Sequence, residues 1–252
     1  MQALSTRKMP RRRDERAERG RLARVMRVLA LETSTLAGGV ALCEDGRVVG
    51  LSLLNVALTH SERLMSMVDR LLEDCRWTLA QVQGLAVSIG PGSFTGLRVG
   101  VATVKGLALA LGLPVAAVPT LDALAANLPF ADAPVCTLLD ARKGEVYVCL
   151  YQWTGQVMER RSDYLALPPQ DVADWLRAPV IVIGDGVPAC RPYLERLGDG
   201  VRVAPAAQSV PSAAMIGQIG HGMLAAGKGI SGDALEPLYL RPSEAELKAR
   251  RV

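Results

Sequence analysis

The stretch LAVSIGPGSFTGLRVGVATVKGLALAL, residues 85–111, decides the fold class of this chain. Its first five residues are apolar or small and have the length of a buried strand. GPGSFTG (90–96) follows as a glycine-rich turn. Beyond the turn, apolar residues recur at helical spacing to about Leu111. A buried strand that leads through a tight turn into a helix is typical of α/β proteins.

The glycine-rich turn has two interpretations. In the first, its backbone N–H groups lie at a helix N-terminus and bind an anion such as phosphate, because the helix dipole favours negative charge there. The turn matches neither a Walker loop, since no Lys-Ser/Thr pair follows it, nor G-x-G-x-x-G. In the second, the glycines only allow the helix to lie close to the sheet. The residues of the possible anion or nucleotide site are Gly90, Gly92, Ser93, Thr95 and Gly96.

The same order of strands and helices occurs twice along the chain. Before the turn, apolar runs predict a meander of three strands, with Asp45-Gly46 as the hairpin signal, and then a helix capped by Thr59 over residues 61–75. From about Pro134 a second meander begins, with later helices near 192–197 and over 211–226. We therefore expect two related α/β halves with mixed sheets, 26–130 and 131–241, between a basic extension (1–25) and a charged tail (242–252).

The composition is that of a folded protein. Of the 252 residues, 50% are hydrophobic and 21% are charged, which excludes wholesale disorder. Aromatic residues make up 4%, so bases stacked along a row of aromatic rings are not expected. The five cysteines form no C-x-x-C pair, so the sequence supports neither a zinc site nor a disulfide framework, and we expect a cytoplasmic protein.

Positive charge is concentrated at the N-terminus. The net charge is +4, but residues 1–25 hold nine Lys/Arg and three Asp/Glu, which leaves −2 for the rest of the chain. The body therefore lacks the basic balance typical of direct nucleic-acid binding. The extension is interpreted as a phosphate-binding arm, a solvated segment or the product of an upstream start, with Met26 as the usual first residue.

Residues 99–118 are almost all apolar and have about the length of a membrane span. Lys105 lies inside this segment, and Gly112 and Pro114 divide it into a helix and a strand. We therefore expect a buried helix–turn–strand unit and no membrane association.

Candidate catalytic and metal-binding residues are few. The two histidines, His60 and His221, are far apart in the sequence and lack H-x-x-x-H spacing. Glu32 and Asp140 end strands at corresponding places in the two halves, where they either face a cleft and serve a metal–phosphate group or cap the following turns. G-x-S-x-G is absent from the sequence. We expect no catalytic residue and no metal site.

The helix after the glycine-rich turn has two rows of small residues. Gly96 and Gly100 form one row, and Ala102, Gly106 and Ala110 form the other. Small side chains let two backbones approach closely. One row fits the packing of the helix on its own sheet, and the second leaves room for a partner helix.

Five blocks of the sequence resemble the TsaB (YeaZ) family. They are LALETSTLAGGVAL (29–42), HSERLMSMVDRLL (60–72), residues 90–125 beginning with GPGSFTG, LLDARKGEVYVCLY (138–151) and EPLYLR (236–241). The resemblance runs from Met26 to about Arg241 and implies an actin-like ATPase fold of two ribonuclease-H-like halves. It also implies a role in forming threonylcarbamoyladenosine next to the anticodon of tRNA.

The resemblance further implies a non-catalytic subunit. TsaD, a paralogue, transfers the threonylcarbamoyl group, and a TsaB-like chain forms a heterodimer with TsaD that the ATPase TsaE joins. The resemblance implies contact with tRNA through this complex, a possible homodimer in isolation, and no cofactor of its own, since ATP and a divalent metal belong to the partner subunits. TsaD-like proteins carry a His-x-x-x-His metal pair where this chain has Thr120 and Leu124, and neither side chain replaces an imidazole ligand.

In this family the first two helices of the N-terminal half pack against TsaD. Here those helices are 61–75 and 96–111, and the candidate partner-binding residues are Arg63, Leu64, Met67, Val68, Leu71, Arg98, Val101 and Lys105. The alternative function, from a different class, is a nucleotide-dependent phosphotransferase or ATPase that uses the actin-like cleft. ATP turnover by the chain alone would distinguish the two.

Overall fold

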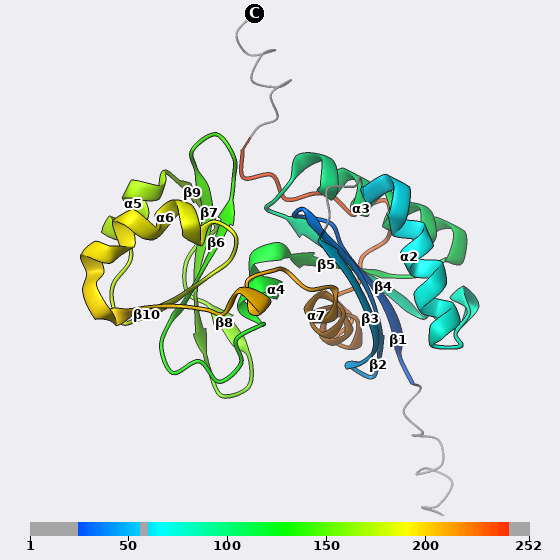
Figure 1. Ribbon diagram of the computed structural model, residues 1–252. Coiled ribbons are helices and arrows are strands. Elements are labelled where there is room, and N and C mark those ends of the chain that lie inside the picture. Colours follow the sequence, from blue (N-terminus) through cyan, green and yellow to red (C-terminus); the bar gives the residue numbers. More distant parts are fainter. Residues whose placement is uncertain (1–24, 56–59, 242–252) are drawn as a thin grey trace, which may run out of the picture.

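The computed structural model describes residues 25–55 and 60–241, so the predicted cap at Thr59 lies outside the described residues. Two lobes, each built on one sheet, lie next to each other (Figure 1). The N-terminal sheet has the strand order β3-β2-β1-β4-β5, and β2 runs antiparallel to both of its neighbours. Its strands are β1 (Arg27–Glu32), β2 (Ala37–Glu44), β3 (Arg47–Asn55), β4 (Gly84–Gly90) and β5 (Val115–Pro119).

The C-terminal sheet repeats this topology. Its order, β8-β7-β6-β10-β11, matches the N-terminal order strand for strand, with β7 antiparallel to both neighbours and β10 and β11 parallel to β6. The predicted fold class, α/β with two mixed sheets flanked by helices, is confirmed. The strands are β6 (Val135–Asp140), β7 (Val146–Trp153), β8 (Met158–Arg160), β9 (Leu165–Leu167, also paired with β7), β10 (Val180–Ile183) and β11 (Val201–Val203).

Helices cover both faces of the N-terminal sheet. α2 (His60–Asp74) and α3 (Phe94–Leu111) lie on one face, and α7 (Ala213–Ala225) lies on the other (Figure 1). α3 begins where the Ser93 hydroxyl accepts a hydrogen bond from the Gly96 N–H at 3.3 Å, and it ends at Gly112, whose left-handed conformation suits glycine. The remaining helical segments are η1 (Leu79–Gln81), α4 (Thr120–Ala125), α5 (Pro169–Trp175), α6 (Val187–Leu194), η2 (Glu195–Gly200) and η3 (Ala206–Gln208).

The helix predicted near residues 192–197 begins earlier than expected. α6 starts at Val187, directly after the Gly184-Asp185-Gly186 turn, and contains Pro192 in its interior. Pro188 lies in the first turn of α6, where a backbone N–H has no partner within the helix, so a proline there loses no hydrogen bond. The sequence analysis placed the helix start near Pro192, whereas the proline in the first turn is Pro188.

The two halves exchange their last helices. α4 follows β5 of the N-terminal sheet, yet Leu121, Leu124 and Ala125 pack in the core of the C-terminal half. α7 follows the C-terminal sheet, yet Ala213 and Ile216 pack with the strands of the N-terminal sheet. The expected C-terminal half, 131–241, therefore includes a helix, α7, that packs on the N-terminal sheet. Apolar periodicity shows that a helix has a buried face, but it does not show which sheet buries it.

Two glycines allow α7 to lie directly on the N-terminal sheet. A Cβ atom at Gly217 would lie 2.4 Å from the Cys43 sulfur, and one at Gly220 would lie 2.4 Å from the Ala86 Cβ. Real side chains do not approach so closely, so any larger residue at either position would push the helix away from the strands. Figure 1 shows α7 between the N-terminal sheet and the C-terminal lobe.

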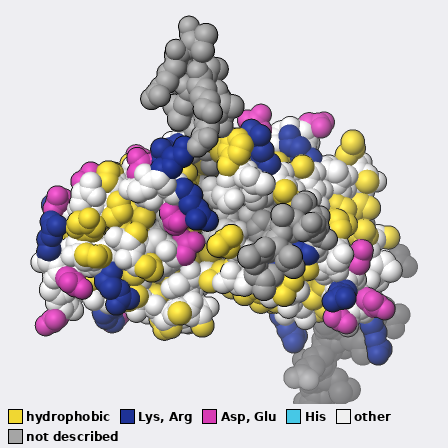
Figure 2. Space-filling view, turned by 45° about the horizontal axis from the view of Figure 1, so that its top comes forward, with side chains coloured by type: hydrophobic (Ala, Val, Ile, Leu, Met, Phe, Trp, Pro, Cys, Tyr) yellow, Lys and Arg dark blue, Asp and Glu magenta, His cyan; other side chains and the backbone are white. Residues whose placement is uncertain are grey.

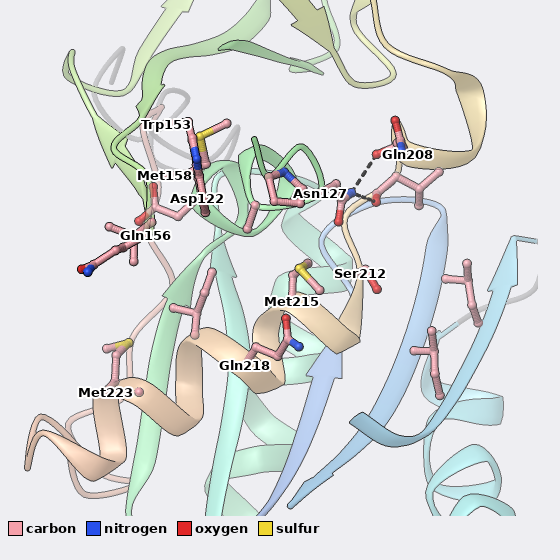
Figure 3. A pocket seen from close by; sticks show the side chains of 18 of the residues that line it. Asp122, Asn127, Trp153, Gln156, Met158, Gln208, Ser212, Met215, Gln218 and Met223 are labelled. Carbon is pink, nitrogen blue, oxygen red and sulfur yellow. Dashed lines mark hydrogen bonds between the residues drawn. The ribbon is translucent and has the colours of Figure 1, made fainter. Parts of the chain in front are cut away.

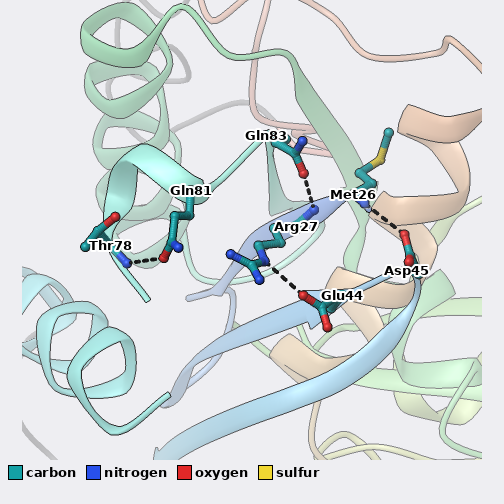
Figure 4. Close-up of polar contacts among 7 residues, drawn as sticks. All are labelled: Met26, Arg27, Glu44, Asp45, Thr78, Gln81 and Gln83. Carbon is teal, nitrogen blue, oxygen red and sulfur yellow. Dashed lines mark hydrogen bonds and ion pairs between the residues drawn. The ribbon is translucent and has the colours of Figure 1, made fainter. Parts of the chain in front are cut away.

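The start of β1 is held by side chains of the body itself (Figure 4). The Met26 N–H donates to Asp45 at 2.8 Å, and the Arg27 N–H donates to Gln83 at 2.9 Å. The Arg27 guanidinium pairs with Glu44 at 2.9 Å and lies 4.5 Å from the centre of the Trp77 ring. Residues 26 and 27 are therefore fixed to the rest of the N-terminal half by hydrogen bonds and an ion pair.

A C-terminal strap, residues 228–241, returns over the N-terminal half. Ile230 exchanges two backbone hydrogen bonds with Val115 of β5, at 2.8 and 2.9 Å, and Leu238 donates to the Ile89 carbonyl at 2.7 Å. Leu235 is fully buried in the N-terminal core. The strap ends at the C-terminal lobe, where Arg241 pairs with Glu145. It therefore joins the two lobes on the side opposite α7.

A buried carboxyl group lies at the end of β1. Glu32 is fully buried, and its Oε1 accepts hydrogen bonds from the backbone N–H of Ser34 at 2.6 Å and from its hydroxyl at 2.5 Å. Glu32 Oε2 has no hydrogen-bond partner among the described residues. Burial raises the pKa of Glu32 above its ordinary value of 4.5, although the hydrogen bonds from Ser34 and Ser88 oppose this shift.

One helix of the described residues, α3, has the length and apolar composition of a membrane span. A single helix of this kind is weak evidence for a span, because core helices pass the same test. Its buried residues pack on the sheet of this chain, as the sequence predicts.

The raised pKa of Glu32 makes stability depend on pH. The folded state holds this proton more tightly than the unfolded chain, so the stabilisation is complete below the ordinary carboxyl pKa and is lost as pH rises through the folded pKa. Glu32→Gln keeps an oxygen that accepts from Ser34 and cannot ionise. We expect the variant to gain stability relative to the wild type with rising pH, by at most about 1.4 kcal/mol per pH unit.

Urea unfolding of both proteins between about pH 4 and pH 9 measures this difference. A gap between the two midpoints that stays constant with pH would contradict the assignment.

Candidate functional site

α2 and α3 lie next to each other on the outer face of the N-terminal sheet (Figure 1). Their inner sides share one core with the sheet: Val68 from α2 and Val104 from α3 are fully buried with Leu29 and Leu31 of β1. The outer sides of the two helices face away from the chain. They form the surface on which the family resemblance places a partner.

Most of the predicted partner-binding side chains do not reach this surface. Arg98 is exposed and Lys105 is half-buried, but the other six predicted residues are buried within the chain. When a helix covers a sheet, its most apolar side faces that sheet. The predicted residues lie on this side of α2 and α3, so they belong to the core and not to a partner surface. The prediction is therefore wrong, as an accessible surface, for Arg63, Leu64, Met67, Val68, Leu71 and Val101.

The exposed apolar residues of the two helices lie outside that stripe. Leu109 of α3 is 81% exposed and Met65 of α2 is 39% exposed. Ala102, Gly106 and Ala110 are exposed as well, and a Cβ atom at Gly106 would meet nothing within 4 Å. This row of small residues is the outer one of the two rows in the sequence, while Gly96 and Gly100 are buried. Sequence reasoning missed the large apolar residues that lie outside the main apolar stripe of each helix, which indicate an exposed apolar surface.

Arg98 and Lys105 connect α3 to the C-terminal strap. Arg98 donates to the Tyr239 hydroxyl at 3.2 Å, and its guanidinium lies 3.8 Å from the centre of the Phe94 ring. Phe94 and Tyr239 also contact each other, with ring centres 5.0 Å apart. The Lys105 ammonium donates to the Asp233 carbonyl at 3.4 Å. Both cations thus have contacts within the chain at one border of the exposed face.

The glycine-rich turn is packed between the β1–β2 loop and the strap. The Ser93 N–H donates to the Ser34 carbonyl at 2.6 Å, and a Cβ atom at Gly92 would lie 2.4 Å from the same oxygen. A Cβ atom at Gly90 would lie 2.7 Å from the Leu238 carbonyl oxygen. Of the possible anion site, Ser93 and Thr95 are exposed. These contacts favour the interpretation that the glycines serve close packing, and anion binding stays a prediction.

The two strand-end carboxylates act on their own turns. Asp140 accepts a hydrogen bond from the Arg142 N–H at 2.7 Å, as Glu32 does from Ser34. Asp185 accepts from the Asp140 N–H at 2.9 Å, and burial raises the pKa of Asp185. Within residues 25–55 and 60–241, no three His, Cys, Asp or Glu side chains gather as a metal site would require.

An apolar groove lies between the two halves, along the exposed side of α7 (Figure 3). It has a volume of about 1160 Å³. Met215, Ile219 and Met223 of α7 form its floor, Trp153 and Val157 come from the β7–β8 hairpin, and Leu51 and Leu53 come from β3. Sequence reasoning missed this groove because residues from four distant segments form it.

One carboxylate in the groove wall fastens α4 to the C-terminal half. Asp122 accepts hydrogen bonds from the hydroxyls of Tyr151 and Tyr164, both at 2.7 Å. Burial raises the pKa of each tyrosine, and the negative charge of Asp122 raises it further. Asn127, at the end of the same segment, donates to the Gln208 carbonyl at 2.7 Å and to the Val210 carbonyl at 2.9 Å (Figure 3).

The surface charge gives no single-sign patch on the face that Figure 2 shows. Lys and Arg side chains alternate there with Asp and Glu, and apolar side chains lie between them (Figure 2). The face in Figure 2 therefore lacks the continuous basic patch that is typical of a nucleic-acid footprint.

Comparisons with known proteins identify the family. The family model described as "TsaD: tRNA N6-adenosine threonylcarbamoyltransferase" matches residues 55–184. The TsaB protein of Bacillus subtilis is 35% identical over 232 residues, which cover 88% of this chain and 97% of that protein. The TsaB protein of Escherichia coli is 34% identical over 236 residues, which cover 87% and 96%.

A solved structure has the same fold. YeaZ from Pseudomonas aeruginosa superposes with a TM-score of 0.74 at 32% identity, covering 85% of this chain and 100% of that one. The predicted resemblance is thus confirmed over both halves. The chain belongs to the TsaB (YeaZ) family of tRNA threonylcarbamoyladenosine biosynthesis proteins and carries a TsaD-like domain.

Proposed function

We propose that this chain is a non-catalytic subunit that supports threonylcarbamoyl transfer to tRNA by binding a TsaD-type transferase through the outer face of α2 and α3. The observation that carries the proposal is the exposed apolar face of α3. Ala102, Gly106, Leu109 and Ala110 are exposed and uncharged, and Arg98 and Lys105 border them on the same helix. Small residues allow a partner helix to approach closely, and Leu109 and Met65 provide apolar side chains for burial.

The donor atoms at the position of the TsaD metal pair do not fit a metal. Thr120 and Leu124 lie on α4 and are both fully buried. Leu124 has no ligand atom, and a threonine hydroxyl is a poor ligand beside it. No step of a metal-assisted transfer can therefore be built on these two residues. We place the ATP and the divalent metal of the reaction on the partner subunits, with TsaE as the third member of the assembly.

The polar groups that the sequence suggested for a cleft support the same proposal. Glu32, Asp140 and the N–H of Ser93 already make hydrogen bonds that hold local turns. A nucleotide-dependent phosphotransferase or ATPase would need such groups to face its substrate. Steady ATP hydrolysis by the purified chain, abolished by a substitution at Asp140, would favour that alternative function.

Charged substitutions on the outer face of α3 test the docking surface. Leu109→Arg and Gly106→Arg each place a charge on a site that the fold leaves open, so we expect no loss of thermal stability, and Gly106→Arg also removes a glycine from a helix interior. Binding to the TsaD of the same organism should weaken about 10-fold to 100-fold, because the charge must be desolvated at the interface. Titration calorimetry measures the affinity.

Val157→Arg is the matched control, since Val157 is also an exposed apolar residue but lies on the β7–β8 hairpin. This variant should bind TsaD with wild-type affinity. Threonylcarbamoyladenosine formation should decrease in the two α3 variants and stay at the wild-type level in the control. Wild-type affinity of both α3 variants would refute the proposed surface.

Removal of residues 1–25 tests whether the basic extension contributes. We expect full support of tRNA modification by a chain that starts at Met26, because β1 is held by Asp45, Gln83 and Glu44 of the body. Reconstituted modification with tRNA, TsaD and TsaE measures the activity of both forms. A large loss of tRNA binding at moderate salt on truncation would instead make the extension a phosphate-binding arm.

A further inference from the structure

Arg63, in the first turn of α2, is a buried cation without a counter-ion among the described residues. It is 8% exposed, and its Nε and Nη1 atoms are buried with no hydrogen-bond partner within residues 25–55 and 60–241. Its Nη2 donates to the Leu36 carbonyl at 3.5 Å, a distance at the limit of a hydrogen bond. None of the ion pairs in the described part of the chain includes Arg63.

A buried guanidinium of this kind requires an anion. Arginine keeps its proton in proteins, so burial does not remove the charge. A buried charge that lacks a partner destabilises a fold strongly, because the lost hydration is not replaced. A water molecule can accept a hydrogen bond from one free N–H group, but it cannot balance the charge. The free N–H groups of Arg63 therefore indicate a negatively charged ligand.

Two helices begin at the edge of the N-terminal sheet where β1 ends. β2 is antiparallel to both β1 and β3, and β4 is parallel to β1, so β1, β3 and β4 all run in the same direction. α2 follows β3 and α3 follows β4, which places both helix N-termini at that edge. A helix N-terminus carries unpaired N–H groups and a partial positive charge. The two N-termini therefore add to the positive potential around Arg63.

A hydroxyl group at the same edge also lacks a partner. Thr33, directly after β1, is fully buried, and its Oγ1 has no hydrogen-bond partner in the part of the chain that the structure describes. This oxygen is the atom nearest to the Cβ position of Gly100, so it faces α3. Arg63 contacts the same β1–β2 loop through the Leu36 carbonyl. An unpartnered cation and an unpartnered hydroxyl donor thus meet one loop, on the side of the sheet that α2 and α3 cover.

We propose that Arg63 binds a carboxylate of the transferase, an aspartate or glutamate side chain that enters at the N-terminal ends of α2 and α3. The inference rests on the proposed function, because the outer sides of the same two helices are the proposed docking surface. Leu36, whose carbonyl Arg63 contacts, is 63% exposed, and Met65, two residues further along α2, is 39% exposed. Apolar side chains that surround a charge pair exclude water and strengthen its attraction.

The charge of the site fits a carboxylate better than a phosphate group. A carboxylate carries one negative charge, which one guanidinium balances, and its oxygens accept hydrogen bonds from both free N–H groups of Arg63. A phosphate group carries about −1.5 to −2 charges and three acceptor oxygens, which exceeds what one guanidinium and one hydroxyl satisfy.

Thermal unfolding of the chain alone tests whether the charge of Arg63 is unpaired. Arg63→Met removes the charge and keeps an unbranched side chain. We expect this variant to unfold at the wild-type temperature or above it, because it no longer buries a charge without a counter-ion. Arg191→Met, at an exposed arginine of α6, is the matched control and should leave the unfolding temperature nearly unchanged. Unfolding of Arg63→Met several degrees below the wild type would show that the chain itself supplies the counter-ion, and would overturn the proposal.

Titration with the TsaD of the same organism tests the carboxylate partner. Arg63→Met should weaken binding about 10-fold to 100-fold, because the carboxylate of TsaD would then be buried without a cation. Arg63→Lys keeps the charge but lacks the planar fork, so it should restore part of the affinity. Arg191→Met should bind with wild-type affinity. If Arg63→Met also binds with wild-type affinity, this inference fails, while Leu109→Arg and Gly106→Arg still decide separately whether the proposed docking surface is correct.

Inorganic phosphate tests whether a free anion fills the site instead. We expect the wild type to unfold at the same temperature in about 50 mM sodium phosphate and in sodium chloride of equal ionic strength, because the partner of Arg63 is a side chain of the transferase. A rise of the unfolding temperature in phosphate that Arg63→Met abolishes would make this a site for a free anion. That result would overturn the assignment to a carboxylate of the transferase.

Discussion

The contact of α7 with the N-terminal sheet is the constraint on which the rest of the structure depends. α7 is a late helix of the chain, yet it covers the inner face of the first sheet, and Gly217 and Gly220 let its backbone come within van der Waals reach of Cys43 and Ala86. α4 makes the reciprocal contact in the C-terminal half. Each sheet therefore completes its core with a helix from the other half.

This exchange determines which surfaces remain for other molecules. One face of the N-terminal sheet receives α7 from the second half, so α2 and α3 cover the opposite face by themselves, with their outer sides exposed. The same arrangement leaves a groove along α7 on the other side of the sheet. Two surfaces of different chemistry result: a helical face with small residues and an apolar groove along α7.

Packing also gives a structural role to the turn that looks suited to phosphate. The N–H of Ser93 is bonded to the Ser34 carbonyl, Gly92 is in contact with the same loop, and the strap passes over Gly90. The buried Glu32 side chain fixes the β1–β2 loop by accepting two hydrogen bonds from Ser34. A family that shares a domain with a transferase can keep the turn for its geometry, since close packing of helix, loop and strap requires the same glycines.

The local pattern of the sequence determined the elements. The Asp45-Gly46 hairpin and the Gly112 stop follow from rules that act within a few residues, and the repeated order of elements was enough for the class of fold. The quoted blocks determined the family in the same way. These features are readable because they depend on neighbours in the chain.

Only the tertiary structure decided which side of each helix is outside. Leu64, Val68 and Val101 form convincing apolar stripes, and a stripe looks the same whether its own sheet or a partner buries it. The same limit hid the sheet that α7 covers, the groove formed by Leu51, Trp153 and Met215, and the exposure of Leu109. Burial is a property of residues far apart in the chain, and no periodicity within one segment contains that information.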